Sequence, residues 1–287
     1  MKNKRPNVYN YKEFTIFLKD ALGFYQKKEN LSLRDLGKKL NTQVSMLSMV
    51  LNKKRIPSEA LLKKIYNFLD LSEVEVKSVN QLKTIYKSKE IEIQKSSLES
   101  LNKKKDFRNA HREEYEFSQY LSKWYYVAIK ELTVLSDFVE DAGWIQNKLS
   151  FSVTKTEIRK AIKFLKKTEI IVLENGKLIS SHKQMNCEDG IFRISLGGFH
   201  KQILNLISKA IDVIPREQRL ILGYTLSLSE KNKVLADEIL KEAFDKIKNL
   251  DLQLGLADSN SDKTTKVYHV ELASIPLSSS GEKNGKK

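Results

Sequence analysis

Residues 36–51 read LGKKLNTQVSMLSMVL, and this stretch decides the fold of the N-terminal part of the chain. Apolar residues recur at helical spacing on both sides of Asn41, in one helix that ends near Leu40 and a second over about Val44–Leu51. Apart from Gly, Asn is the residue that best tolerates the left-handed backbone of a tight turn. The stretch therefore predicts two short helices joined by a turn, which is a helix-turn-helix motif.

The sequence also predicts a helix on either side of this motif. Ser32 precedes the first short helix and has Asp35 three residues on, which resembles a capping box. Pro57-Ser58 ends the loop after the motif and starts another helix. Apolar stripes at helical spacing predict the two flanking helices: Phe14, Phe17, Leu18, Ala21, Leu22 and Tyr25 before the motif, and Leu61, Leu62, Ile65, Phe68 and Leu69 after it.

Together these elements resemble the Cro and λ-repressor class of helix-turn-helix domains over about residues 11–72. Leu36-Gly37 matches the leucine and the small residue that let the two helices approach, and residues 52–58 resemble the basic loop of the family. Three positions depart from the family pattern: Asn41 stands where the turn usually has Gly, Gln43 where the helix cap is usually Ser, and Met49 where a polar or basic residue usually contacts a base.

The resemblance implies that Gln43–Leu51 is a recognition helix for the major groove of double-stranded DNA. Gln can bond adenine, Ser can bond several bases, and Val or Met can contact the thymine methyl group, whereas Lys and Arg neutralise phosphates. The predicted base contacts are Gln43, Val44, Ser45, Met46, Ser48 and Met49. The predicted phosphate contacts are Lys38, Lys39, Asn52, Lys53, Lys54 and Arg55.

The charge of the chain is concentrated in the same region. The chain holds 51 Lys and Arg against 36 Asp and Glu, a net charge of +15. Residues 1–70 hold 15 of these basic residues against 6 acidic ones, so +9 lies in the first quarter of the chain. Such asymmetry favours a module that binds a polyanion. The alternative is that lysines are solvated and the fold serves protein contacts.

The composition excludes several other classes of protein. Of 287 residues, 40% are apolar, and the single cysteine Cys187 excludes an internal disulfide or a Cys-rich zinc site. The sequence has no apolar run long enough for a membrane helix, no secretory signal, and no motif of nucleotide-binding or hydrolytic enzymes. We therefore expect a cytoplasmic protein that is not an enzyme and needs no metal or cofactor. The four histidines are scattered along the chain: His111, His182, His200 and His269.

A helical connector is predicted over residues 73–116, and residues 117–182 predict three helices followed by a hairpin. Thr154 and Glu157 form a capping box that opens the third helix, and Asn175-Gly176 separates two apolar runs as a hairpin turn does. This is the order of a winged-helix domain. The third helix offers a candidate second DNA contact at Arg159, Lys160 and Lys163, although the unit could instead serve packing or dimerisation.

The C-terminal residues 183–277 predict a small α+β domain for dimerisation or sensing. Strands are expected over residues 192–196, 220–228 and 267–272, helices over 199–213 and after Ser229, a turn at Gly197-Gly198, a polar loop over 255–263 and a disordered tail over 278–287. Cys187 would be a redox-sensing thiol if it were exposed, but neighbouring acids would raise its pKa. The predicted fold class is mainly α with a smaller α+β part: a Cro-like domain over 8–72, a winged-helix-like unit and this C-terminal domain.

A wider resemblance covers nearly the whole chain. The helix with Trp124-Tyr125-Tyr126, the winged-helix-like middle and residues 267–277 (VYHVELASIPL) are similar to one uncharacterised family of transcriptional regulators, numerous in predatory and fibre-degrading bacteria. That family carries a domain of unknown function behind its Cro-like module, and it supplies no known ligand or catalytic residue. We expect a homodimeric DNA-binding regulator, because one such motif reads only a half-site, with an unidentified effector or protein partner. The alternative is a signalling adaptor.

Overall fold

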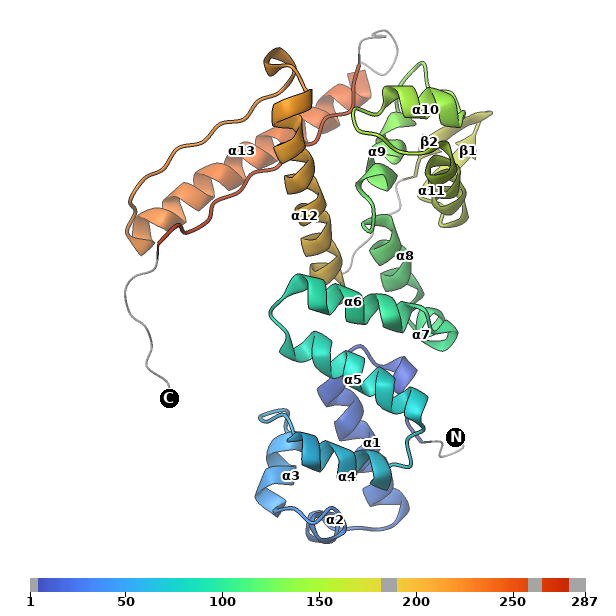
Figure 1. Ribbon diagram of the computed structural model, residues 1–287, viewed down its shortest axis with the longest axis vertical. Coiled ribbons are helices and arrows are strands. Elements are labelled where there is room, and N and C mark those ends of the chain that lie inside the picture. Colours follow the sequence, from blue (N-terminus) through green and yellow to red (C-terminus); the bar gives the residue numbers. More distant parts are fainter. Residues whose placement is uncertain (1–4, 182–189, 258–264, 279–287) are drawn as a thin grey trace. The chain divides into compact units, whose positions relative to one another are not determined.

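The computed structural model describes residues 5–181, 190–257 and 265–278 (Figure 1). The protein is mainly helical, and its described residues form one small two-stranded sheet. The chain divides into two compact units, one of residues 1–123 with 184–201 and the other of residues 124–183 with 202–287. The predicted redox site at Cys187, together with His182 and residues 279–287 of the predicted tail, lies outside the described residues.

Four helices at the start of the first unit enclose a common core. Ser32 and Ser58 cap two of them as the sequence predicts, and Ser32 forms its capping box with Asp35. The side chains of Phe17, Leu47 and Leu62 are completely buried in this core. The elements are a 3-10 turn η1 (Val8–Asn10) and the helices α1 (Phe14–Lys28), α2 (Leu33–Lys39), α3 (Val44–Leu51) and α4 (Glu59–Phe68).

The same core continues through the segment that was predicted as a helical connector. Val79 and Leu82 pack into it from one helix, Leu98 and Leu101 from the next, and Phe107 from a third. This segment is therefore part of the first compact unit. Its helices are α5 (Glu73–Lys87), α6 (Ile91–Asn102), α7 (Lys105–Ala110) and α8 (Arg112–Tyr120).

Helix α12 (Gly190–Val213) contributes its first turns to this unit. Ile191 and Ile194 are buried in the core and stand one helical turn apart, so the strand predicted over residues 192–196 is wrong. Gly197 also lies inside the helix and not in the predicted turn, and its lack of a side chain lets α6 pass close to it. A Cβ atom at Gly197 would lie 3.1 Å from the side chain of Ile91.

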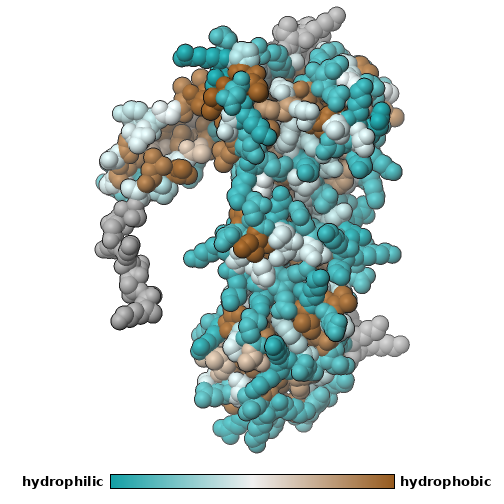
Figure 2. Space-filling view, viewed as in Figure 1, coloured by the Kyte–Doolittle hydropathy of each residue, from teal (hydrophilic) through white to brown (hydrophobic). Residues whose placement is uncertain are grey.

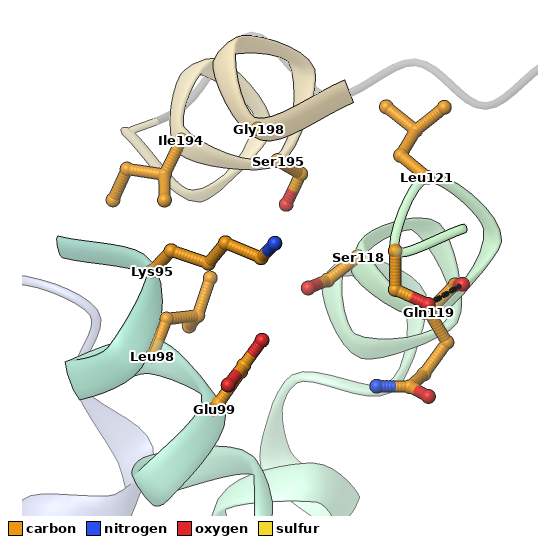
Figure 3. Close-up of a pocket in the computed structure, with 10 residues that line it drawn as sticks. Lys95, Leu98, Glu99, Ser118, Gln119, Leu121, Ile194, Ser195 and Gly198 are labelled. Carbon is orange, nitrogen blue, oxygen red and sulfur yellow. Dashed lines mark hydrogen bonds between the residues drawn. The ribbon is translucent and has the colours of Figure 1, made fainter. Parts of the chain in front are cut away.

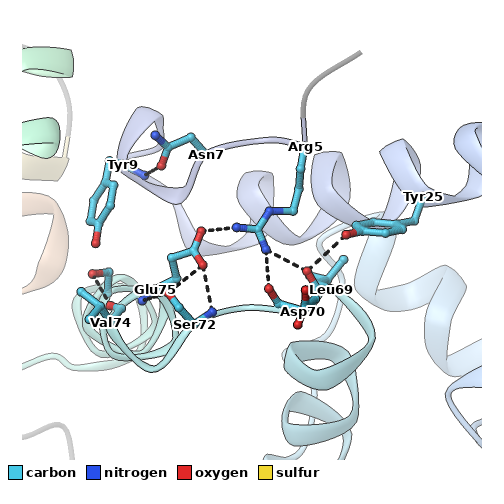
Figure 4. A network of polar contacts seen from close by, with 10 residues as sticks. Arg5, Asn7, Tyr9, Tyr25, Leu69, Asp70, Ser72, Val74 and Glu75 are labelled. Carbon is cyan, nitrogen blue, oxygen red and sulfur yellow. Dashed lines mark hydrogen bonds and ion pairs between the residues drawn. The ribbon is translucent and has the colours of Figure 1, made fainter. Parts of the chain in front are cut away.

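A polar network fixes the start of the chain to the junction between α4 and α5 (Figure 4). The Arg5 guanidinium donates hydrogen bonds to the carbonyl oxygens of Leu69 (2.9 Å) and Asp70 (2.7 Å) and pairs with the Glu75 carboxylate. The backbone N–H and hydroxyl of Ser72 donate to the same carboxylate at 2.9 and 2.8 Å. Burial raises the pKa of Glu75, but the bonds from Ser72 and Arg5 outweigh it, so the net pKa lies below its usual range.

The second unit begins with three helices and a hairpin, in the predicted order. The capping box of Thr154 and Glu157 is present, and Asn175 and Gly176 both have positive φ (49° and 78°), as a type I′ hairpin turn requires. The strands pair antiparallel, with Glu174 opposite Lys177 at the turn. The elements are α9 (Trp124–Leu132), α10 (Ala142–Lys148), α11 (Lys155–Lys167), β1 (Ile171–Glu174) and β2 (Lys177–Ser180).

The C-terminal part of the second unit consists of the end of α12, a 3-10 turn η2 (Arg216–Gln218) and the long helix α13 (Glu230–Ala257). Helix α13 continues through Gly255, where a loop was predicted. The segments predicted as strands, Leu220–Leu228 and Val267–Leu272, run as extended chain before and after α13 (Figure 1). Neither forms a strand within the described part of the chain, so the expected antiparallel pair is not formed there.

Candidate nucleic-acid interface

The turn between α2 and α3 brings the two helices into close contact. Gly37 is buried, and a Cβ atom at this position would lie 3.1 Å from the carbonyl oxygen of Thr42 and 3.5 Å from Cγ2 of Val44. Only Gly allows this approach without a shift of the backbone. Asn41 has a φ of 45°, which is the left-handed conformation that the sequence predicts at the turn.

Helix α3 has one buried side and one open side. Leu47 and Val50 are buried and hold the helix on the core. Gln43, Val44 and Ser45 are exposed at its N-terminal turn. The Gln43 side chain makes no capping hydrogen bond to α3, so Gln43 is the weak cap that the sequence predicts and its amide is not held by the helix. The exposed side chains of the predicted reading surface therefore gather at the first turn of the helix.

The other three predicted base contacts are less accessible. Met46 is half-buried and packs against the core cluster. Ser48 and Met49 are half-buried as well. The Ser48 carbonyl oxygen accepts a hydrogen bond of 2.9 Å from the Asn52 side-chain amide. The structure thus separates the six predicted base contacts into an open group of three and a more enclosed group of three.

The loop after α3 folds back on the end of the helix and displays its basic side chains. The backbone N–H groups of Lys54 and Arg55 both donate to the carbonyl oxygen of Met49, at 2.8 and 3.2 Å. Lys53 has a φ of 60°, so the chain turns sharply here. All six predicted phosphate contacts are exposed: Lys38, Lys39, Asn52, Lys53, Lys54 and Arg55.

Some of these cations are already paired within the protein. Lys39 pairs with Glu29, and its Nζ lies 5.8 Å from the centre of the Phe68 ring. The Lys53 ammonium lies 3.9 Å from the Glu13 carboxylate. Within the residues that the structure describes, Lys38, Lys54 and Arg55 make no ion pair. These three cations could therefore bind a phosphate without first breaking an ion pair.

Lys64 is a basic residue of this surface that the sequence did not reveal. Its Nζ donates a hydrogen bond of 3.1 Å to the carbonyl oxygen of Asn41, in the turn between α2 and α3. A partner 23 positions away leaves no local pattern, so no motif or spacing could have found it. The contact supports the turn on which the position of α3 depends.

An acidic residue near the motif is engaged in local contacts. The pKa of Asp35 is lowered, first by the hydrogen bonds from Ser32 and then by the charges of Lys38 and Lys39. Its carboxylate thus stays ionised and serves as a helix cap.

A second basic face lies on α11 in the other unit. Arg159, Lys160 and Lys163 are exposed there, while Ile158, Ala161 and Ile162 on the opposite side are buried. Three cations on one side of a helix suit a polyanion, but this unit carries a net charge of only +3 over residues 125–183. These three residues are the predicted second DNA contact.

A small pocket in the first unit lies between α6, α8 and the start of α12 (Figure 3). Lys95 and Glu99 line it from α6, with Ser118 and Ser195 facing them. Its volume of about 20 Å³ is roughly that of a site for one water molecule, so it does not hold an effector. Over residues 5–181, 190–257 and 265–278 no cluster of His, Cys, Asp and Glu could bind a metal ion.

None of the helices in the described part of the chain is both long and apolar enough to span a membrane.

Two families match parts of the chain. The family described as Domain of unknown function (DUF4423) matches residues 103–277, which is more than half of the chain. The family described as Helix-turn-helix matches residues 26–76, and this range includes α2, the turn and α3. No curated protein and no solved structure gives a match. The helix-turn-helix match thus falls on the surface that carries the predicted base and phosphate contacts.

Proposed function

Because the chain belongs to the DUF4423 family and carries the helix-turn-helix domain of a DNA-binding regulator, we propose that it acts in the cytoplasm as a homodimeric transcriptional regulator. Helix α3 would enter the major groove of double-stranded DNA, and the C-terminal part would respond to an effector or a protein partner. The observation that carries this proposal is the surface of α3 and its loop. There, Gln43, Val44 and Ser45 are exposed at the first turn of α3, and Lys38 of α2 and Lys54 and Arg55 of the loop after α3 are exposed without an ion pair to any described residue.

The chemistry of this surface divides into two roles. The side chains of the first α3 turn would read base edges, with the Gln43 amide suited to adenine and the Val44 side chain to a thymine methyl group. The cations of the loop would neutralise phosphates and fix the position of the domain on the duplex. The half-buried Met46, Ser48 and Met49 would contribute to the reading surface from its edge.

A homodimer would match the way in which this class of motif finds its site. One recognition helix reads only a few base pairs, and dimers reach specificity by reading two half-sites about one helical turn apart. The winged-helix-like unit would then connect DNA binding to the C-terminal part. Its face at Arg159, Lys160 and Lys163 would add a second, weaker contact to the backbone of the same duplex.

The test is a pair of triple variants measured on duplex DNA over a range of salt concentrations. Replacing Lys53, Lys54 and Arg55 by Ala should weaken binding to all sequences and reduce the slope of log K against log salt by about two to three. The matched control replaces Lys103, Lys104 and Lys105 by Ala, which removes the same charge at a distance from α3, and should leave the slope unchanged. Equal loss in both variants would mean that only total charge matters. Unchanged DNA binding in the first variant would favour the signalling adaptor.

A further inference from the structure

Residues 220–278 contain apolar side chains that stay exposed among the residues that the structure describes. This segment, which we call the arm, consists of α13 and the extended stretches on either side of it. Among its described side chains not one is buried. Figure 2 shows hydrophobic residues gathered over the arm. Of the large apolar residues that are exposed in the described chain, eighteen of twenty-eight belong to it.

The first extended stretch has the apolar pattern of a half-buried strand, but its apolar side is exposed. Every second residue of this stretch is large and apolar, and in an extended chain such residues lie on one side. They are Leu220, Leu222, Tyr224, Leu226 and Leu228. Leu220, Leu222 and Tyr224 are 82%, 83% and 86% exposed. A side of a strand that is this apolar is stable only against other apolar groups.

Within the described residues, the backbone of this stretch also lacks hydrogen-bond partners. No backbone hydrogen bond joins Leu220 through Leu228 to any other described residue, and Arg219 just before it has extended backbone angles. An extended chain with a free edge and an apolar side recruits another strand.

Helix α13 also has an apolar side that is only partly covered. Ala236, Leu240, Phe244 and Ile247 follow one another at helical spacing, and Phe244 and Ile247 are each 40% exposed. The opposite side carries charged residues, namely Glu238, Lys241, Glu242, Asp245 and Lys248. A helix of this kind normally lays its apolar side on a sheet or another helix.

Along the chain, the arm runs as extended stretch, helix α13 and second extended stretch. Lys266 Nζ donates to Oε1 of Gln218 at 3.4 Å, so the second stretch starts near the start of the first. Figure 1 shows both stretches running in the same direction, with α13 returning between them. Half of a two-layer α/β domain has this order, and the other half must come from elsewhere.

We propose that a second copy of this chain supplies the other half, so that the two arms form one shared domain of paired strands and apolar helix sides. The proposal names the dimer contact of the homodimer proposed above and therefore rests on it. A two-fold axis would bring the same apolar surface of both copies together, as in an isologous dimer. The exposed large apolar residues of the arm present on the order of 1,500 Å² of accessible surface per copy. A stable dimer buries roughly 800 Å² per partner, so the arm offers enough surface for such a contact.

The charge of the arm favours a second copy over DNA as the occupant. Residues 219–278 hold 8 basic and 9 acidic residues, so they neither attract a polyanion nor repel each other across a two-fold axis. The charged side of α13 would stay in solvent when its apolar side is covered.

The experiment compares the full-length protein with two double variants by analytical ultracentrifugation. The wild type should sediment at twice its mass of 33.2 kDa at concentrations on the order of 10 µM. Replacing Leu222 and Tyr224 by Lys should weaken the dimer by about 100-fold or more. Because both side chains are exposed in one chain, the substitutions should leave the fold of each unit intact. The control replaces the exposed Val134 and Leu173 by Lys and should remain dimeric.

Two further readouts separate this proposal from that of DNA binding. The amides of Leu220–Leu228 should be protected from hydrogen exchange in the wild type and exchange freely in the Leu222 and Tyr224 variant. That variant should still bind a single half-site at low salt, because α3 is untouched. A monomeric wild type, or a dimer in which these amides are unprotected, would overturn the arm proposal. A dimer with protected amides and no affinity for DNA would support the arm and contradict the proposed function.

Discussion

The helix-turn-helix region and the arm both have regular apolar patterns, yet among the described residues only the pattern of the first region is covered by the rest of the chain. In the helix-turn-helix region, the core between α1, α3 and α4 completely buries Phe17, Leu47 and Leu62. Leu222 and Tyr224 remain almost fully exposed, although their alternation is as regular. A periodic pattern indicates which side of an element must be covered, and it does not say whether the covering group belongs to the same molecule.

The largest expected effect comes from removing a buried side chain in the first region. Leu47→Ala should lower the free energy of unfolding by about 2–5 kcal/mol, because it empties space in a closed core under the recognition helix. Leu222→Ala is the matched change in the arm. It should leave the unfolding of the dissociated monomer unchanged and weaken only the dimer. Chemical denaturation at low and high protein concentration measures both, and equal losses of monomer stability in the two variants would show that Leu222 is packed within one chain.

A smaller effect is expected at the contact between α2 and α3. Gly37→Ala should destabilise the protein by about 1–3 kcal/mol and weaken DNA binding, because the new methyl group meets the Thr42 carbonyl oxygen at 3.1 Å. Gly23→Ala, inside α1 where no atom lies within 4 Å of the added Cβ, should stabilise it by about 0.5–1 kcal/mol. Thermal unfolding compares the stability of the two variants. If both variants lost stability, the contact of Gly37 with the Thr42 carbonyl oxygen would not be the cause of the loss.

The network at Arg5 predicts a modest dependence on pH. The folded-state pKa of Glu75 lies below its unfolded value, so its contribution is complete at neutral pH and is lost as the pH falls below the ordinary value of 4.5. Glu75→Gln should lower stability at pH 7 by about 0.5–1 kcal/mol, a figure reduced for solvent screening, and flatten the acid limb of the stability curve. Urea titrations between pH 3 and 7 measure it, and an unchanged acid limb would contradict the account.

The smallest effect is expected on the second basic face. Replacing Arg159, Lys160 and Lys163 by Ala should reduce the salt slope of DNA binding by less than the loop variant does, by about one unit or below. The charge removed is the same, so the difference between the two variants measures which unit holds the duplex. A larger loss from the α11 variant would move the principal DNA contact from α3 to the winged-helix-like unit.

Local signals in the sequence predicted much of this architecture. Capping boxes at Ser32 and Thr154, the left-handed Asn41 and the Asn175-Gly176 turn depend only on neighbouring residues, and all are present as predicted. Residues 192–196 were predicted as a strand because a short apolar run fits either a strand or a buried helix, and only packing against α6 decides between them.

Local sequence signals could not predict contacts between residues that lie far apart in the sequence. Arg5 contacts Leu69 and Glu75, which lie 64 and 70 positions away, and Lys64 contacts Asn41, 23 positions away. No spacing encodes pairs of this kind. The candidate DNA surface was predictable in outline for the opposite reason, since its helix, turn and basic loop are contiguous in sequence. What the sequence did not indicate was that, of the six predicted base contacts, only Gln43, Val44 and Ser45 are exposed.

The most direct test of DNA recognition by α3 is the selection of bound duplexes from a random pool, with the wild type and Gln43→Ala compared in parallel. The wild type should enrich a sequence with two related half-sites about one helical turn apart, and Gln43→Ala should relax the choice of base at one position in each half-site. A wild-type protein that enriches no sequence over the starting pool would contradict DNA recognition by α3.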